Sequence, residues 1–177
     1  QLNEFKKLKF NVTGCEPSKS LSEVAVKKKI KTINSMFTSD TIKKLKKKKF
    51  DVILLSYTFD HLQNPKDFLK NIKKILNKDG ILVIEVHDLD KIFRNIEFCL
   101  FEHEHSIYLN RKTAKKLLAF LGFEIINFNI VSQRDRRANS LLFVAKLSNN
   151  RMENETKIAQ TNSLNFVEFK KNIKSGI

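Results

Sequence analysis

The chain has 177 residues, a length typical of one domain with a single hydrophobic core. Hydrophobic residues make up 41% and charged residues 30% of it, a balance that excludes a disordered tail and a membrane protein. The two cysteines, Cys15 and Cys99, are too few for a disulfide scaffold, so we expect a cytoplasmic protein.

The net charge of +15 suggests nucleic acid, an anionic membrane surface or acidic substrates as partners. The basic residues, however, divide into 28 lysines and 6 arginines, whereas proteins that read nucleic acids usually depend on arginine for bidentate contacts. We therefore expect no nucleic-acid partner, and keep a non-enzymatic basic binding module as an alternative.

The first third of the chain alternates strand and helix patterns. We expect a strand at residues 10–15, a helix at 20–29 capped by Ser18 or Ser20, a strand at 31–34, and a helix capped by Ser39 that runs to about residue 48. The first helix carries an apolar stripe, which predicts its buried face: Leu21, Val24 and Ala25. The lysine run at residues 43–49 predicts a solvated face.

Two continuous apolar runs follow. Residues 50–55 (FDVILL) and 81–86 (ILVIEV) predict parallel strands covered on both faces. Between them, Asn64 and Pro65 predict the start of a helix that carries Phe68, Leu69, Ile72, Ile75 and Leu76 and ends at Asp79-Gly80, with Gly80 in a left-handed turn.

The last elements change the pattern. A long connection at residues 87–110 precedes a helix at 111–121 closed by Gly122, and then two neighbouring strands at 123–130 and 140–147. This order predicts an α/β fold with a Rossmann-like, doubly wound, mostly parallel sheet and a C-terminal antiparallel hairpin. We expect residues 149–177 to form a polar linker and a helix at 164–174.

Four stretches together resemble the class I S-adenosylmethionine-dependent methyltransferases, and within them the branch that methylates carbon atoms of deoxysugars. They are residues 14–18 (GCEPS), 50–61 (FDVILLSYTFDH), 64–86 and 98–108 (FCLFEHEHSIY). The last is the discriminating one, because it is similar to the family's HEH segment, which there contains the catalytic base. The resemblance implies S-adenosyl-L-methionine as cofactor and a small-molecule substrate of the nucleotide-sugar class.

The chain departs from the family at both ends. The family's first strand and its glycine-rich cofactor loop have no counterpart, so we expect residues 1–148 to be a partial methyltransferase domain, inactive as a fragment. The missing strand would lie between two strands of this chain, leaving one edge of each unpaired.

The resemblance implies a cofactor site at the ends of three strands. Glu16 would accept hydrogen bonds from the ribose hydroxyls, Phe37 and Thr38 would contact the adenine, and Ser56 and Tyr57 would line the methionine side. Phe37 has an open alternative role in the core, since the chain contains 15 phenylalanines.

The HEH segment would contain the catalytic residues. Removing a proton next to a carbonyl group suits a histidine near neutral pH, and the resemblance implies that His105 is this base. Glu104 would bind substrate or orient the ring, and Tyr108 would supply a phenolic group, because the family often has tyrosine where Glu102 stands here.

Other residues are expected to face the substrate: His61, Glu85, His103 and Asn139. The family often has proline where His87 stands. We expect no metal, although in an extended segment His103 and His105 would point the same way and, with His87, could ligate one. The basic segment Arg134, Arg136 and Arg137 is either a clamp for a phosphate group or a surface turn.

We thus expect a methyltransferase that acts on carbon through a histidine base, with a small-molecule O-methyltransferase as the first alternative.

Overall fold

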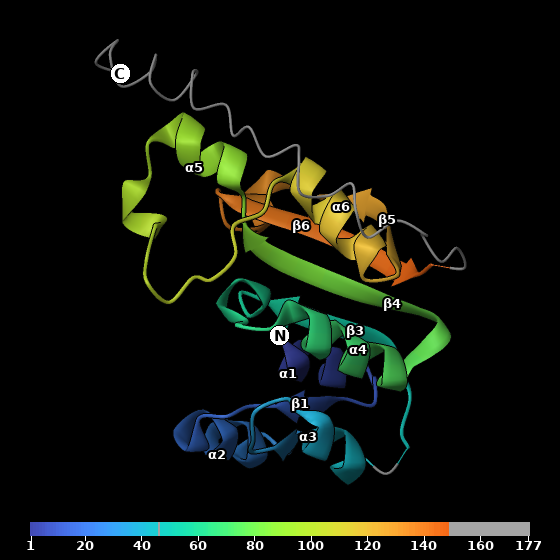
Figure 1. Ribbon diagram of the computed structural model, residues 1–177. Coiled ribbons are helices and arrows are strands. Elements are labelled where there is room, and N and C mark those ends of the chain that lie inside the picture. The colour runs from blue at the N-terminus through green and yellow to red at the C-terminus, as the bar shows by residue number, and fades with distance from the viewer. Residues whose placement is uncertain (46, 149–177) are drawn as a thin grey trace. The chain divides into compact units, whose positions relative to one another are not determined.

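The structure is a computed structural model that describes residues 1–45 and 47–148 (Figure 1). It forms two compact units, which we describe separately: unit 1 comprises Gln1–Lys49 and Asp67–Ile75, and unit 2 comprises Phe50–Lys66 and the described residues from Leu76 onward. The predicted linker from residue 149 and the predicted helix at 164–174 lie outside the described residues.

Unit 1 contains a small parallel sheet and short helices. Strand β1 (Thr13–Cys15) pairs with β2 (Lys31–Ile33). The helices are α1 (Leu2–Lys7), α2 (Lys19–Lys27), α3 (Ser39–Lys44) and most of α4 (Pro65–Ile75). The predicted alternation of strand and helix is confirmed, whereas α1 has no counterpart among the predicted elements.

Two predicted details of unit 1 are wrong. The strand starts at Thr13 rather than residue 10, because Phe10 packs edge-on against Phe5 of α1, with 6.0 Å between ring centroids. The stripe on α2 is not buried: Leu21 is 59% and Val24 is 48% exposed, since strands of three residues cover little of the helix.

The caps of these helices follow local side-chain chemistry. Ser18 caps α2 as predicted, accepting a hydrogen bond from the Leu21 N–H. The cap of α3 is Thr38 and not Ser39, because the buried Thr41 hydroxyl accepts a hydrogen bond from the Thr38 N–H at 3.3 Å. The described lysines of the run at 43–49 are exposed, as predicted, while Leu45 is buried.

Unit 2 is built on a four-stranded sheet of order β3-β4-β6-β5. Strand β3 (Phe50–Ser56) is parallel to β4 (Leu76–His87), and β6 (Ser140–Leu147) is antiparallel to both β4 and β5 (Phe123–Phe128). The predicted terminal hairpin is therefore confirmed. Within the described residues β1 pairs only with β2 and β3 only with β4, so each lies at the edge of its own sheet.

The open edge explains why one burial prediction is wrong. The run at residues 50–55 was expected to be covered on both faces, but Asp51 and Val52 are exposed, Val52 by 50%. A strand at a sheet edge is covered on fewer sides than one between two partners.

The junction between α4 and β4 also differs from the prediction. The helix ends at Ile75, and the next residue, Leu76, already pairs with Phe50 of β3. The next pair joins Ile81 to Val52, so β4 has extra residues between these two pairs and forms a bulge there. Gly80 lies within this strand and has no left-handed φ; a Cβ there would lie 2.9 Å from Leu76 Cδ1 and 3.0 Å from the Phe50 carbonyl oxygen. Close backbone approach, rather than a turn, requires this glycine.

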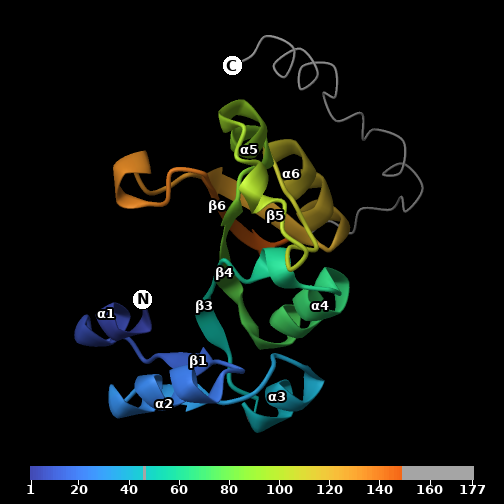
Figure 2. The same ribbon diagram turned by 90° about the vertical axis from the view of Figure 1, so that its left-hand side faces the viewer.

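Helices complete unit 2. The connection at residues 87–110 contains α5 (Leu89–Asn95), which was not predicted, and α6 (Arg111–Phe120) lies alongside β5 (Figures 1 and 2). Asn110 caps α6 by accepting from the Thr113 N–H at 2.9 Å, and Gly122 follows it with a left-handed φ of 75°. The core contains fully buried residues of each layer, among them Leu82, Leu118, Phe123 and Phe143.

In the part of the chain that the structure describes, the loops contain three single-turn 3-10 helices: η1 (Phe59–His61), η2 (Phe98–Leu100) and η3 (Gln133–Asp135). Within residues 1–45 and 47–148, no helix has the length and apolarity needed to cross a lipid bilayer.

Candidate active site

The site in unit 2 starts where the parallel strands β3 and β4 end. Ser56 closes β3, and its hydroxyl donates to Glu85 Oε2 of β4 at 3.0 Å. Tyr57 follows in a left-handed conformation (φ 48°) and donates its N–H to the Glu85 carbonyl at 2.8 Å. Parallel strands bring their carboxyl ends to one edge, the usual ligand-binding edge of open α/β sheets.

Asp60 of η1 connects this edge to the HEH segment. Its carbonyl oxygen accepts hydrogen bonds from the N–H groups of Ser106 at 2.9 Å and Ile107 at 3.2 Å. Its carboxylate oxygen Oδ2 accepts from Nδ1 of His87, the last residue of β4, at 3.1 Å. Asp60 is only 2% exposed, so it fixes the loop after β3, the end of β4 and the HEH segment together.

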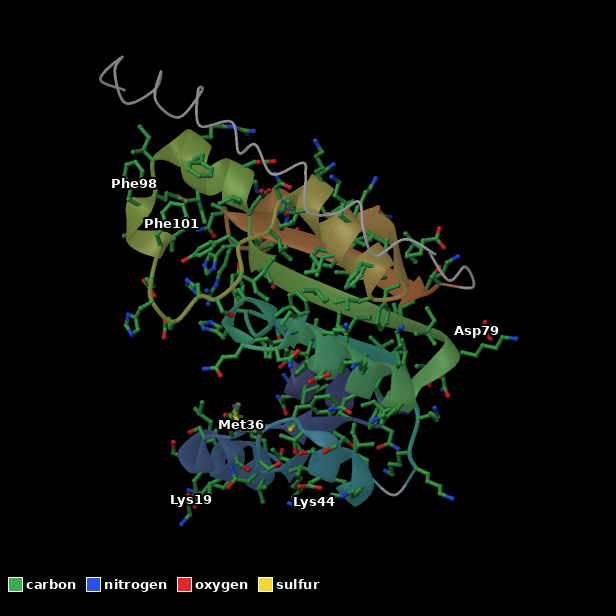
Figure 3. The ribbon with its side chains drawn as sticks, in the orientation of Figure 1. Lys19, Met36, Lys44, Asp79, Phe98 and Phe101 are labelled. Atoms are coloured by element: carbon green, nitrogen blue, oxygen red, sulfur yellow. The ribbon has the colours of Figure 1, made fainter. Side chains whose placement is uncertain are left out.

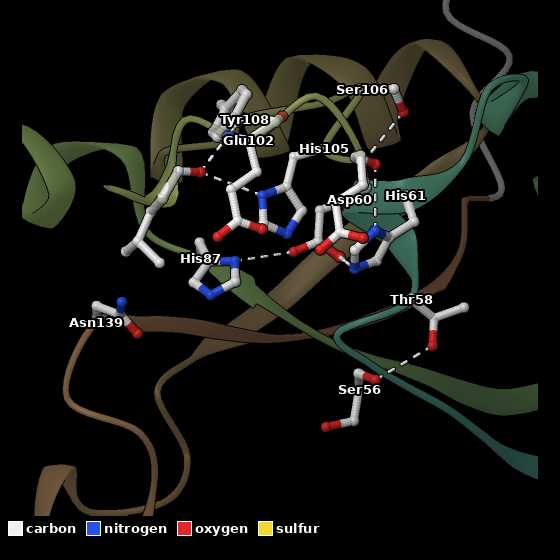
Figure 4. A network of polar contacts seen from close by, with 12 residues as sticks. Ser56, Thr58, Asp60, His61, His87, Glu102, His105, Ser106, Tyr108 and Asn139 are labelled. Carbon is white, nitrogen blue, oxygen red and sulfur yellow. Dashed lines mark hydrogen bonds and ion pairs between the residues drawn. The ribbon is translucent and has the colours of Figure 1, made fainter. Parts of the chain in front are cut away.

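Three imidazole rings meet around Asp60 (Figure 4). The centroid of the His105 ring lies 4.7 Å from that of His61 and 5.0 Å from that of His87. The Tyr57 ring continues the group, 5.0 Å from His87. The sequence predicted His61 and His105 as neighbours of one site, and the structure brings them together.

The hydrogen bonds of the three histidines define their tautomers. In each ring Nδ1 lies 3.1–3.2 Å from an atom that only accepts: the Glu104 carbonyl for His61, the Asp60 carboxylate for His87 and the Leu100 carbonyl for His105. Nδ1 therefore carries the hydrogen, and in a neutral ring Nε2 retains a lone pair. Each histidine can thus accept a proton or bind a cation through Nε2.

Tyr108 and the exposed acids have different surroundings. The Tyr108 hydroxyl accepts from the Glu102 N–H and lies 3.1 Å from the Leu100 carbonyl, so it braces the loop, and burial raises the pKa of this phenol. Glu104 is exposed but has a carboxylate oxygen within 4.8 Å of ring nitrogens of His61 and His105. His103 is exposed and belongs to neither group of clustered ligand atoms found among the described residues.

An aromatic surface leads away from His105. The Tyr108 ring lies 5.8 Å from His105 and 5.1 Å from Phe101. Phe98 and Phe101, in the segment that follows α5, are 43% and 42% exposed (Figure 3). The site therefore has apolar rings beside its polar centre.

The basic segment before β6 does not act as one clamp. The Arg137 guanidinium lies 4.2 Å from the centre of the Tyr57 ring, Arg136 donates to the Ser140 carbonyl, and Arg134 lies beside Asp135. Burial and, to a smaller extent, the negative charge of the nearby Glu85 raise the pKa of Tyr57 to about 12, so this phenol stays neutral.

Asn139, a predicted substrate contact, is held by the backbone. Its carbonyl accepts from the Asp88 N–H at 2.7 Å, and its side-chain amide lies 3.5 Å from Glu97 Oε2.

The remaining predicted cofactor residues lie in unit 1. Glu16 follows β1, and its Oε1 accepts from the Ser18 N–H at 2.8 Å. Phe37 packs on Phe68 of α4 with 4.9 Å between centroids, which favours the core role left open for it. Thr38 caps α3. Glu16 follows a strand as predicted, whereas the position of Thr38 at the start of α3 was not predicted.

Asp60 was missed by the sequence analysis. Within the described residues its buried Oδ1 has no hydrogen-bond partner, and His61 Nε2 lies 3.9 Å from it. The only signal in the sequence is an acid next to a histidine just after an apolar strand, and that pair is common on protein surfaces.

Comparisons with known proteins agree with this architecture. A family model described as "Methyltransferase domain" matches residues 2–127. C-methyltransferase NovU of Streptomyces niveus is 24% identical over 129 residues, which are 71% of this chain; the chain spans 30% of that protein's length.

Solved structures share the fold at low identity. The 1,6-didemethyltoxoflavin-N1-methyltransferase of Burkholderia thailandensis, crystallised with S-adenosylhomocysteine, aligns with a TM-score of 0.58 at 15% identity, over 82% of this chain and 64% of that one. The glycopeptide N-methyltransferase MtfA, crystallised with S-adenosylmethionine, aligns with a TM-score of 0.57 at 14% identity, over 82% of this chain and 81% of that one. The predicted Rossmann-like fold is confirmed, and with the family model covering well over half of its residues, the chain belongs to the methyltransferase-domain family.

Proposed function

We propose that this chain is part of an S-adenosylmethionine-dependent methyltransferase that acts on a small molecule and methylates a carbon atom next to a carbonyl group. Family membership and the cofactors bound by the structural neighbours support the methyl transfer. The observation that carries the choice of carbon is the anchored His105 ring, with its Nδ1–H donated to the Leu100 carbonyl at 3.2 Å.

The residues expected at the cofactor fit a nucleoside with ribose hydroxyls. Glu16 uses Oε1 for the Ser18 N–H, and its second oxygen is free of any hydrogen bond found within the described residues. A carboxylate oxygen at a strand end can accept a charge-assisted bond from a hydroxyl. When bound, the cofactor supplies an electrophilic methyl group on a sulfonium.

His105 would begin the reaction. Its Nε2 would take the proton from the carbon next to the substrate carbonyl, and that carbon would keep the electron pair with which to accept the methyl group that the cofactor supplies. The imidazolium formed lies within 4.8 Å of the Asp60 carboxylate, whose negative charge stabilises it. Tyr108 and the Leu100 carbonyl hold the loop and the ring in place.

Substitution of His105 tests the proposal. In the methyltransferase that contains this chain, His105→Ala is expected to slow turnover by roughly 10²–10⁴, the contribution of a positioned general base. Asp79→Ala, at an exposed position of β4, is the control and should leave turnover unchanged. Near-wild-type turnover of His105→Ala would exclude His105 as the base.

Product analysis separates carbon from oxygen as the acceptor. A keto-sugar nucleotide is the first substrate to try, and a ¹³C-labelled methyl group reports by its NMR shift whether it is bound to carbon or oxygen. An O-methyl product would favour the O-methyltransferase alternative, in which a base matters less.

A further inference from the structure

Asp60, His87 and His105 form a cluster of a composition that binds metal ions. Each offers one ligand atom, and the three atoms lie within 4.8 Å of one another. We propose that this cluster is a binding site for a divalent transition metal ion of the zinc class. The binding itself does not depend on the proposed methyl transfer.

The buried carboxylate of Asp60 supports a cationic ligand. Its side chain is 3% exposed, Oδ1 has no hydrogen-bond partner, and its ion-pair partners within the described residues are the imidazoles of His61 and His87. An unsatisfied buried charge is costly, and buried charges are usually paired or coordinate a metal. A metal ion between Asp60 and the imidazoles would supply the missing partner.

The donor set selects the class of ion. Two imidazole nitrogens and one carboxylate oxygen suit zinc, iron(II), cobalt or manganese, whereas calcium and magnesium prefer all-oxygen sites. Three protein ligands are also the usual number where one position stays open for water or substrate. From the sequence, His87, His103 and His105 could ligate a metal; in the structure the buried Asp60 takes the place of the exposed His103.

The distances are close to those of a bound site. Ligand bonds of about 2.0–2.2 Å place the ligand atoms of a tetrahedral ion roughly 3.3 Å apart. Asp60 Oδ2 and His87 Nδ1 are 3.1 Å apart and share a hydrogen bond, so an ion held between them would take the place of that hydrogen, which would move to Nε2 of His87. The ligand atom of His105 lies within 4.8 Å of the other two and would move closer to them on binding, and its Nδ1–H bond to the Leu100 carbonyl orients the ring as outer hydrogen bonds do for metal-binding histidines.

A second, overlapping group is the competing assignment. His61 and Glu104 also have ligand atoms within 4.8 Å of one on His105. Both are exposed, and water already solvates an exposed carboxylate, so this group has less need of an ion. We therefore assign the ion to the group that contains Asp60.

Occupancy has a consequence for catalysis, and this consequence alone rests on the proposed function. A bound ion takes the Nε2 lone pair that His105 needs as a base. Zinc is therefore expected to inhibit methyl transfer, and a chelator to restore it.

Cobalt(II) is the probe for the binding test, because its visible absorption reports coordination without any activity assay. The chain is expected to bind one equivalent of cobalt with intense visible bands that zinc displaces. Asp60→Asn and His87→Gln are each expected to weaken the affinity roughly tenfold or more, since even outer-shell substitutions cost about 10–100-fold. His103→Gln is the matched control and should bind like the wild type. Circular dichroism of each variant without metal checks that it folds.

Several outcomes would overturn the assignment. One is the absence of intense visible bands when cobalt is added to the wild type. Another is a cobalt affinity of Asp60→Asn and His87→Gln equal to that of the wild type. A third is a loss of cobalt affinity that occurs only in His61→Gln and Glu104→Gln. A failed metal titration leaves the His105→Ala result untouched, and a failed methyl-transfer assay leaves the cobalt spectrum untouched, so the two proposals fail separately.

Discussion

Replacement of Asp60 by asparagine tests the electrostatic part of the proposed mechanism. The variant keeps a side-chain oxygen that can accept from His87 Nδ1 but removes the negative charge. The ligand atoms of Asp60 and His105 are at most 4.8 Å apart. Two unit charges at that distance attract each other by roughly 3 kcal/mol when the effective dielectric constant is about 20. Since each 1.36 kcal/mol is about a factor of ten in rate, turnover should fall about 100-fold.

The assay is single-turnover transfer of a labelled methyl group in the presence of a chelator, so that metal binding does not contribute. The affinity for S-adenosylmethionine should be unchanged, because the charge acts on the imidazolium formed during the reaction. Asp79→Asn, which removes an exposed carboxylate from β4, is the matched control. Turnover of Asp60→Asn within about twofold of the wild type would refute the argument that this charge stabilises the protonated base.

Three further predictions concern the fold. Gly80→Ala should lower the free energy of unfolding in urea by about 1–3 kcal/mol, because the Phe50 carbonyl, 3.0 Å from the new Cβ, belongs to the backbone and cannot rotate away. Gly14→Ala is the comparison: its Cβ would meet side-chain atoms, which can move, so the loss of stability should be smaller. Tyr57 should ionise near pH 12, well above the usual value of 10; an ultraviolet titration of the phenols measures this, and the chain has no tryptophan to obscure the signal. The stability linked to the neutral phenol should be lost as the pH rises from 10 to about 12. Ionisation near pH 10 while the protein remains folded would contradict the burial of Tyr57. Burial raises the pKa of the Asp88 carboxyl group above 3.8, so the stability contributed by its protonated form is present below pH 3.8 and is lost as the pH rises. Asp88→Asn keeps an N-cap for α5 and should remove this contribution from the pH dependence of the thermal unfolding temperature.

Local chemistry explains which elements could be predicted from the sequence. Caps and punctuating residues are short-range signals, so Ser18, Pro65 and Gly122 mark element ends correctly. The predictions that failed needed tertiary information. Leu76 continues the apolar pattern of α4 yet pairs with Phe50, and Gly80 reads as a turn residue although a bulge in β4 requires it.

The candidate site shows the same division. His105 and His61 were singled out because the segments that contain them resemble a family's motifs, and the structure brings their rings to within 4.7 Å of one another. Asp60 could not be predicted, because its importance depends on burial and on a hydrogen bond to a residue 27 positions away in the chain. No periodicity or spacing rule connects two such positions.

His87 and Asp60 are best understood as one unit. Proline at the position of His87 would offer no donor to a carboxylate. With proline there, Asp60 Oδ2 would lose its 3.1 Å partner, and both oxygens of a carboxylate 3% exposed would then lack a hydrogen bond. Leaving such a group unsatisfied costs at least about 1–3 kcal/mol. The acid after β3 is therefore tolerated because β4 ends in histidine, and the pair gives this chain a charged centre beside His105 that the family motif alone does not specify.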